Sequence, residues 1–207
     1  MYNVERYEWC DFWWEEADDN LKPRVLLIGD SITRSYRPYV NGLLKEKVHV
    51  DMLATSRAVD NPALRQEIDY ILGQNPGVYQ VVPFNNGLHG FHINKYDYQM
   101  QLEDIILHIK NRIAHNRIIL ATSTPVLKQE SLVEPDTCRN PIVLDRNIIV
   151  YRLANKYQLE VNDLYAAMAE KSQCRIDDGF HFNINGQQAQ AVFTADIIRR
   201  KLMDLSI

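Results

Sequence analysis

The sequence has few cysteines, and they are not grouped. Cys10, Cys138 and Cys174 are far apart and odd in number, and they match no metal-ligand spacing. We therefore expect free thiols, no metal site and a reducing, cytoplasmic location. Residues 1–20 are acidic and lack the apolar centre of a secretory signal, although removal of a signal would leave secretion open.

Long apolar runs and basic clusters are also missing. No apolar stretch approaches the roughly 18 residues that a membrane-spanning helix needs. Acidic residues outnumber basic ones, 27 to 23, and the Lys and Arg residues form no run. We therefore expect neither a membrane span nor a nucleic-acid partner.

The length and composition are typical of one folded unit. With 207 residues, 46% of them hydrophobic, the chain can bury a full core, and we expect a single domain over residues 1–207. Residues 1–23 are an aromatic and acidic extension that is expected to pack on this domain. Its Trp9, Trp13 and Trp14 are interpreted as cover for one face of a sheet, with a stacking platform for a sugar ring as the alternative.

Apolar runs alternate with helical patterns along the chain. Strands are predicted at residues 24–28, 48–53, 78–84, 117–122 and 159–162, and helices at 39–45, 63–72, 96–111, 145–157 and 186–205. This alternation predicts a three-layer α/β/α sandwich with a mainly parallel, five-stranded, flavodoxin-like sheet. Residues 124–141 contain three prolines and are predicted to form a long functional loop at the carboxyl edge of the sheet.

The run VLLIGDSIT, residues 25–33, places a serine directly after a buried strand and a glycine turn. In α/β proteins, chemistry gathers at the carboxyl edge of such strands. Ser31 is thus a candidate nucleophile, and its own N–H, at the start of a helix, can stabilise an oxyanion. Alternatively, Asp30 or Ser31 serves only as the N-cap of the next helix.

Two further segments bring polar side chains to the same edge. Asn85 and Asn86 follow the strand at residues 78–84, where an asparagine is either a turn former or a neutral donor to an oxyanion. Asp178 and His181 lie three residues apart across a glycine. Such a turn can hold a carboxylate against the imidazole Nδ1 and leave Nε2 to take a proton from a serine, or it is merely a helix-entry loop.

Taken in order, these segments resemble the SGNH, or GDSL-type, hydrolase family over nearly the whole chain. The first family block reads GDSIT at residues 29–33, and the last reads DGFH at residues 178–181. The resemblance implies Ser31 as the nucleophile, His181 as the general base and Asp178 as the orienting carboxylate. It also implies the three-layer fold of that family.

Two family blocks are altered in this chain. The third, usually Gly-x-Asn-Asp, reads PFNN at residues 83–86, and its register favours Asn85 over Asn86 as an oxyanion donor. The second block lacks its glycine, so another loop N–H, assigned to Arg57, is expected to complete the oxyanion hole. Asp30, His89 and the Arg57 guanidinium are candidate substrate contacts, although Arg57 is equally well interpreted as a surface loop residue.

The resemblance implies a serine esterase that acts through an acyl-enzyme, without a cofactor. The three N-terminal tryptophans, the polar loops and the lack of a long apolar insertion favour a small acyl group. An acetylated carbohydrate or another polar alcohol is the expected substrate. A lipase- or thioesterase-type acylhydrolase is an alternative, as is a non-catalytic ligand-binding module on the same fold. A phosphate-binding protein is disfavoured because residues 29–31 have neither several glycines nor the lysine of a phosphate loop.

Overall fold

The computed structural model describes residues 5–74 and 77–205. Six strands form one sheet in the order β1-β3-β2-β4-β5-β6. Their bounds are β1 Cys10–Trp13, β2 Arg24–Gly29, β3 His49–Thr55, β4 Tyr79–Phe84, β5 Ile118–Ala121 and β6 Glu160–Asn162. All pairings among β2 to β6 are parallel, which confirms the predicted mainly parallel α/β fold.

The prediction of five strands is wrong because the N-terminal segment joins the sheet. β1 pairs antiparallel with β3 and forms one edge. Phe12 and Trp14 pack on the core beside Tyr70, whereas Trp13 is half exposed. This alternation is the pattern of a strand, so the segment extends the sheet, and its inward side chains Phe12 and Trp14 cover part of one face.

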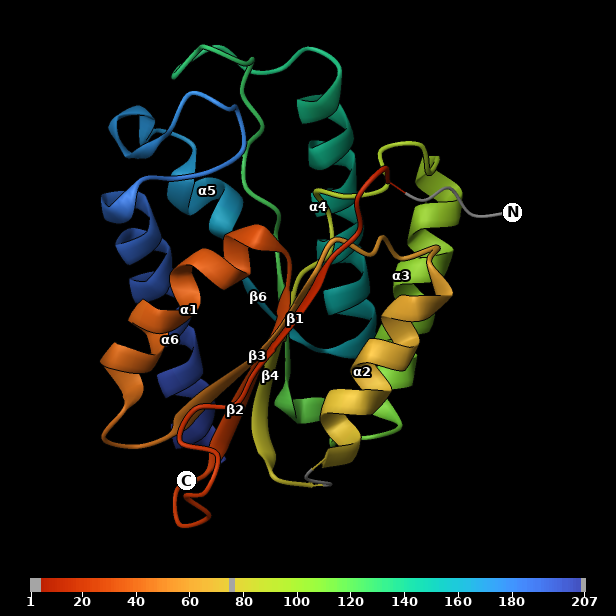
Figure 1. The fold of residues 1–207 in the computed structure, drawn as a ribbon. Coiled ribbons are helices and arrows are strands. Elements are labelled where there is room, and N and C mark those ends of the chain that lie inside the picture. The colour runs from red at the N-terminus through yellow and green to blue at the C-terminus, as the bar shows by residue number, and fades with distance from the viewer. Residues whose placement is uncertain (1–4, 75–76, 206–207) are drawn as a thin grey trace.

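Helices cover both faces of the sheet. Their bounds are α1 Ser31–Leu44, α2 Pro62–Gln74, α3 Lys95–Lys110, α4 Arg139–Tyr157, α5 Leu164–Met168 and α6 Ile184–Asp204, with 3₁₀ turns η1 His115–Arg117 and η2 Ser172–Cys174. Helices α1 and α6 lie on one face, and α2, α3 and α4 lie on the other, as the three-layer prediction requires (Figure 1). Within the described ranges, we find no helix with the length and apolar character to span a membrane.

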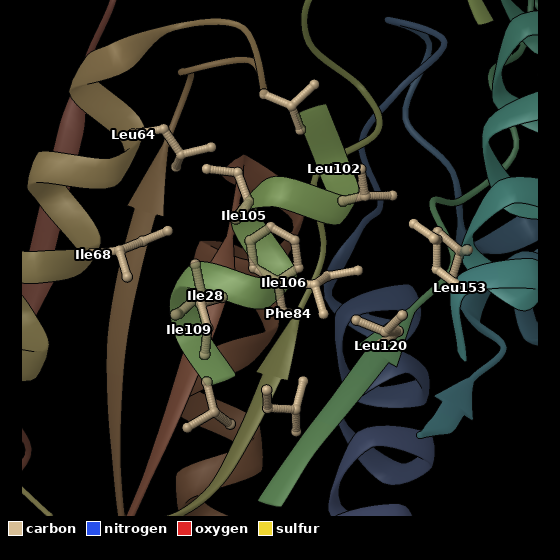
Figure 2. Packing of buried hydrophobic residues seen from close by; sticks show 14 of the residues in the cluster. Ile28, Leu64, Ile68, Phe84, Leu102, Ile105, Ile106, Ile109, Leu120 and Leu153 are labelled. Atoms are coloured by element: carbon tan, nitrogen blue, oxygen red, sulfur yellow. The ribbon is translucent and has the colours of Figure 1, made fainter. Parts of the chain in front are cut away.

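Each face of the sheet has its own apolar core, as the alternation along β2 shows. Leu26 and Ile28 belong to the cluster under α2, α3 and α4, whereas Val25 and Leu27 belong to the cluster under α1 and α6. Figure 2 shows the first cluster, where apolar side chains of α3 lie over Ile28 and its neighbours on β4 and β5. A strand that is buried on both faces cannot slip in register, so the carboxyl end of β2 is a fixed platform.

Two helices begin earlier than the sequence predicts. α1 begins at Ser31 instead of residue 39 and runs through Pro38. α4 begins at Arg139 instead of residue 145 and has Pro141 in its first turn. A proline in a first turn costs little because the first N–H groups of a helix have no intrahelical partner, whereas Pro38 removes one hydrogen bond from α1.

A buried ion pair ties the N-terminal segment to the sheet. Arg24 Nη1 lies 2.8 Å from Asp51 Oδ1, and both side chains are almost fully buried. Arg24 also donates to the carbonyl oxygens of Glu15, Glu16 and Asp19, so one guanidinium organises the connection between β1 and β2. Burial raises the pKa of Asp51, although Arg24 and neighbouring donors oppose this shift.

Replacing Arg24 with methionine leaves Asp51 buried without its counter-ion. We expect Arg24→Met to lower the free energy of unfolding by about 3–5 kcal/mol, measured by urea unfolding. The matched control is Arg65→Met, which removes an exposed guanidinium 3.5 Å from Asp104. That control is expected to cost less than about 1 kcal/mol, and equal losses in the two variants would contradict the importance of the buried pair.

Candidate active site

A tight turn at the carboxyl end of β2 holds Ser31. Gly29 ends the strand, and a Cβ at this position would lie 2.1 Å from the hydroxyl oxygen of Thr33. Glycine therefore lets the chain enter α1 at once. Asp30 caps the helix by accepting from the Ile32 N–H at 2.9 Å. Ser31 is the first residue of α1, where backbone N–H groups lack intrahelical acceptors.

A second turn, between η2 and α6, holds Asp178 and His181. Gly179 has a φ of +83°, and a Cβ there would lie 2.3 Å from the carbonyl oxygen of Leu127. Asp178 Oδ1 accepts from the N–H groups of Phe180 and His181, each at 2.8 Å. These bonds fold the turn so that the carboxylate and the imidazole lie side by side.

The two turns bring Ser31 and His181 together, although 150 residues separate them in sequence. Ser31 Oγ lies 2.7 Å from His181 Nε2. Across the ring, His181 Nδ1 lies 2.5 Å from Asp178 Oδ2. A carboxylate at Nδ1 favours the tautomer in which Nε2 accepts the serine hydroxyl proton. The three residues predicted as a triad thus form one hydrogen-bonded chain, and their catalytic roles stay a prediction.

Asp178 is held in its charged form. Burial acts to raise its pKa, but hydrogen bonds from the His181 N–H, the imidazole and the Phe180 N–H outweigh burial and lower the pKa below its ordinary value. The side chains of Asp178 and His181 are 40% and 38% exposed. At neutral pH the carboxylate is therefore an anion that can orient the imidazole and stabilise an imidazolium.

The proline-rich loop predicted over residues 124–141 supports the histidine turn from outside. The Leu127 N–H donates to the Gly179 carbonyl at 2.8 Å, and the Glu130 N–H donates to the Asp177 carbonyl at 2.8 Å. The part that is irregular is shorter than predicted, because α4 already begins at Arg139. Backbone bonds from this loop therefore fix the position of the turn relative to the sheet edge.

Both candidate oxyanion asparagines are buried and hydrogen-bonded within the protein. Asn85 Nδ2 donates to the Ala121 carbonyl at 2.8 Å and to the Ser123 hydroxyl at 3.2 Å. Asn86 Nδ2 donates to the Arg57 carbonyl at 2.7 Å. Both residues follow β4, which pairs with β2, but neither belongs to the side chains that line the pocket described below.

Arg57 is not among the residues that line the pocket described below, and its contact with substrate stays a prediction. The guanidinium pairs with Glu8 and, at 3.2 Å, with Glu67. Two partly buried carboxylates hold it there by Coulomb attraction. The Arg57 N–H donates to the Thr55 hydroxyl at 3.2 Å, and its assignment to the oxyanion hole stays a prediction.

Asp30 has a structural role as the N-cap of α1, and its contact with substrate stays a prediction. Its side chain is buried, and one carboxylate oxygen caps α1. The other oxygen is buried and has no hydrogen-bond partner in the described part of the chain. As the N-cap, the Asp30 side chain points into the protein. This agrees with the alternative interpretation of residues 29–31, in which Asp30 or Ser31 caps the next helix.

A pocket of about 300 Å³ opens beside Ser31. His89, predicted as a substrate contact, lies in its wall, and His89 Nδ1 is 2.9 Å from Glu5 Oε1. The full lining is Glu5, Ser31, Leu88, His89, Phe91, Arg139, Phe180 and His181. Phe180 lies inside the DGFH motif, so its place in the pocket wall could have been predicted from the sequence. No local pattern marks Glu5 or Arg139, which come to the pocket from distant segments.

Arg146 of α4 fixes the loop that carries the pocket wall. Its side chain is almost fully buried. Nη1 donates to the carbonyl oxygens of Gly87 and His89 at 3.0 and 2.7 Å, and Nη2 donates to that of Gly90 at 2.5 Å. Burial lowers the pKa of Arg146. A guanidinium with five donors in a rigid fork can hold three carbonyl groups in one arrangement, which fixes the loop beneath His89.

The three cysteines form no disulfide bond in the described ranges. Cys10, Cys138 and Cys174 are free thiols. Burial and the nearby Glu67 raise the pKa of Cys10 to about 12, so it is an unreactive thiol at neutral pH. Among residues 5–74 and 77–205, no three His, Cys, Asp or Glu side chains lie together as metal ligands would.

The architecture is similar to that of several solved esterases, while no protein-family model and no curated protein matches the chain. The acetyl xylan esterase AlAXEase has a TM-score of 0.67 at 17% identity, covering 84% of this chain and 99% of its own. The acetylxylan esterase Axe2 from Geobacillus stearothermophilus has a TM-score of 0.64 at 20% identity, covering 87% and 94%. The aryl esterase from M. smegmatis has a TM-score of 0.70 at 12% identity, covering 87% and 100%. These likenesses confirm the predicted SGNH/GDSL-type hydrolase fold.

Removing the Arg146 guanidinium takes one donor from each of three carbonyl groups, of which, in the part of the chain that the structure describes, only that of Gly90 keeps another donor, the Ile93 N–H. We expect Arg146→Met to lower the free energy of unfolding by about 3 kcal/mol and to speed amide hydrogen exchange in residues 87–90. Urea unfolding and exchange followed by mass spectrometry measure the two effects. Arg152→Met is the control on the same helix, since Arg152 is exposed and donates to Gln99. Unchanged exchange in the Arg146 variant would contradict this role.

Proposed function

We propose that this protein is a serine-type carboxylic ester hydrolase. The observation that carries the proposal is the hydrogen-bonded chain from Ser31 through His181 to Asp178, with distances of 2.7 and 2.5 Å. Ser31 and His181 of this hydrogen-bonded chain line a pocket at the carboxyl edge of a parallel sheet. The similarity of the fold to acetyl xylan and aryl esterases supports the same class of reaction.

The reaction proceeds through an acyl-enzyme. His181 Nε2 takes the proton of Ser31 as Oγ attacks the ester carbonyl carbon, and the imidazolium then protonates the departing alcohol. Asp178 at Nδ1 stabilises the imidazolium. Water attacks the acyl-enzyme with His181 as base, which releases the carboxylic acid and restores the serine hydroxyl.

The oxyanion is stabilised at the start of α1. The Ser31 N–H, at the positive end of the helix, is the first donor. Asn85 is the second, and its amide has to exchange the longer of its two bonds, the 3.2 Å contact with Ser123, for the substrate oxygen. Asn86 is the alternative donor. Its amide makes one hydrogen bond within the described residues, to the Arg57 carbonyl, so one of its two N–H groups is left for the substrate oxygen.

Removal of the Ser31 hydroxyl tests the reaction class. We expect Ser31→Ala to reduce kcat for p-nitrophenyl acetate by about 10⁴-fold or more, because no nucleophile is left at Nε2. Ser35→Ala is the matched control in the same helix, since the Ser35 hydroxyl donates to the Ile32 carbonyl and does not line the pocket. Retained hydrolysis in Ser31→Ala would rule out the assignment.

A covalent serine probe separates this proposal from a non-catalytic binding module. A fluorophosphonate labels a serine only when a neighbouring base activates it. Labelling of the wild type and of Ser35→Ala, but not of Ser31→Ala, supports the esterase. An unlabelled wild-type protein supports the binding module instead.

The substrate that we propose is a small acyl ester, such as an acetyl ester, of a carbohydrate or another polar alcohol. The pocket volume of about 300 Å³ lies at the lower end of the range for ligand sites. Its wall combines the apolar Leu88, Phe91 and Phe180 with polar groups, which suits a ring with hydroxyl groups. The acetyl xylan esterases among the similar structures support this substrate class.

Acyl chain length distinguishes the small-acyl proposal from a lipase- or thioesterase-type activity. We expect kcat/KM for p-nitrophenyl esters to fall by about tenfold or more from acetyl to octanoyl, because a pocket of about 300 Å³ has to hold the leaving group as well as the acyl chain. Initial rates at substrate concentrations below KM measure this ratio. A higher kcat/KM for the octanoyl ester would favour the lipase-type alternative.

A further inference from the structure

The N-terminal segment, residues 5–9, crosses the carboxyl edge of the sheet and reaches the pocket. The Trp9 N–H donates to the Ser56 hydroxyl at 2.9 Å, and the Trp9 carbonyl accepts from the Ser56 N–H at 3.1 Å. The Trp9 ring lies 4.5 Å from the guanidinium carbon of Arg34 on α1. Glu8 pairs with Arg57. These contacts fix the path of the segment beside the site.

Beyond these anchors, the segment places the carboxylate of Glu5 in the pocket wall. The partner of Glu5 is His89, with 2.9 Å between Oε1 and Nδ1. The Glu5 side chain is 45% exposed, whereas the His89 side chain is 17% exposed. The carboxylate therefore faces the space that a ligand enters, and the hydrogen bond with His89 holds it in place.

The opposite charge in the wall belongs to Arg139, at the start of α4. Its guanidinium lies 3.5 Å from Asp136 Oδ2 and is 52% exposed. Backbone donors, chiefly the Arg139 N–H, outweigh burial and lower the pKa of Asp136, so this partner is ionised at neutral pH. Asp136 thus offsets the charge of Arg139, whereas Glu5 has no cationic Lys or Arg as its partner in the wall.

We propose that Glu5 is a specificity-determining residue that favours esters with a cationic leaving alcohol over esters with an anionic one. This inference rests on the proposed esterase function. An ester held at Ser31 has its leaving group within the same 300 Å³ pocket, and so within several ångströms of Glu5. At such separations near a surface, unit charges change binding several-fold, with opposite sign for a cation and an anion.

A matched pair of substrates isolates this effect. 3-Acetoxy-N,N,N-trimethylanilinium and 3-acetoxybenzoate carry the same acetyl group on a phenol ring and differ in the charge at one position. We expect Glu5→Gln to reduce the cation-to-anion ratio of kcat/KM by about tenfold at low ionic strength. Addition of 0.5 M salt is expected to shrink the difference between wild type and variant, because salt screens exposed charges.

Two further variants control for indirect effects. Arg139→Gln removes the opposite charge from the same wall and is expected to raise the ratio. Glu46→Gln removes an exposed carboxylate outside the pocket and is expected to leave the ratio unchanged. A merely structural role of the Glu5 contact with His89 would change both rates together and leave their ratio constant.

The outcomes separate this inference from the proposed function. If Ser31-dependent hydrolysis occurs and the ratio is the same in wild type and Glu5→Gln, the specificity role is overturned and the esterase stands. If neither ester is hydrolysed in a Ser31-dependent way, both proposals fail. A fall in the ratio that is confined to Glu5→Gln and weakened by salt supports the specificity role.

Discussion

The site depends on a buried positive charge. Arg146 lies under the loop after β4 and donates to three carbonyl groups there. The next residue of α4, Asn147, bonds both the N–H and the carbonyl of Ser123 at the end of β5. Two neighbouring residues of α4 thus fix the positions of the loop after β4 and the loop after β5 at the sheet edge. Because burying a charge is costly unless its hydrogen bonds are made, the arrangement tolerates little movement.

The candidate nucleophile and base are held by different means. Ser31 follows a strand that is buried on both faces, so its position comes from the core. His181 lies in a half-exposed turn, whose position comes from hydrogen bonds to Asp178 and to the long loop. The Ser31 hydroxyl, fixed by the core, and the His181 imidazole, fixed by hydrogen bonds in a solvent-facing turn, meet at the 2.7 Å contact between Oγ and Nε2. This division places the nucleophile firmly while the imidazole stays open to substrate and water.

Much of the fold was open to prediction, because alternating apolar runs determine strands that are buried on both faces and the helices between them. The predicted triad positions came from the order of two turns along the chain and their resemblance to the SGNH-type family blocks, since each turn alone is equally a helix cap or an entry loop. What the sequence did not predict concerns long-range contacts. The pairing of β1, the ion pairs of Arg57 and the arrival of Glu5 and Arg139 in one wall depend on where distant segments meet. No local sequence pattern predicts such contacts between distant segments.

The separation of Ser31 and His181 in sequence also affects the life of the newly made chain. Ribosomes release the N-terminal part first, so α1 and its serine emerge long before the turn that holds the histidine. Helix α1 packs against the sheet and also against α6, which is synthesised much later than α1. Chains that stop before α6 therefore leave part of the apolar side of α1 uncovered. Such a nascent polypeptide is exposed to chaperones and proteases until α6 docks.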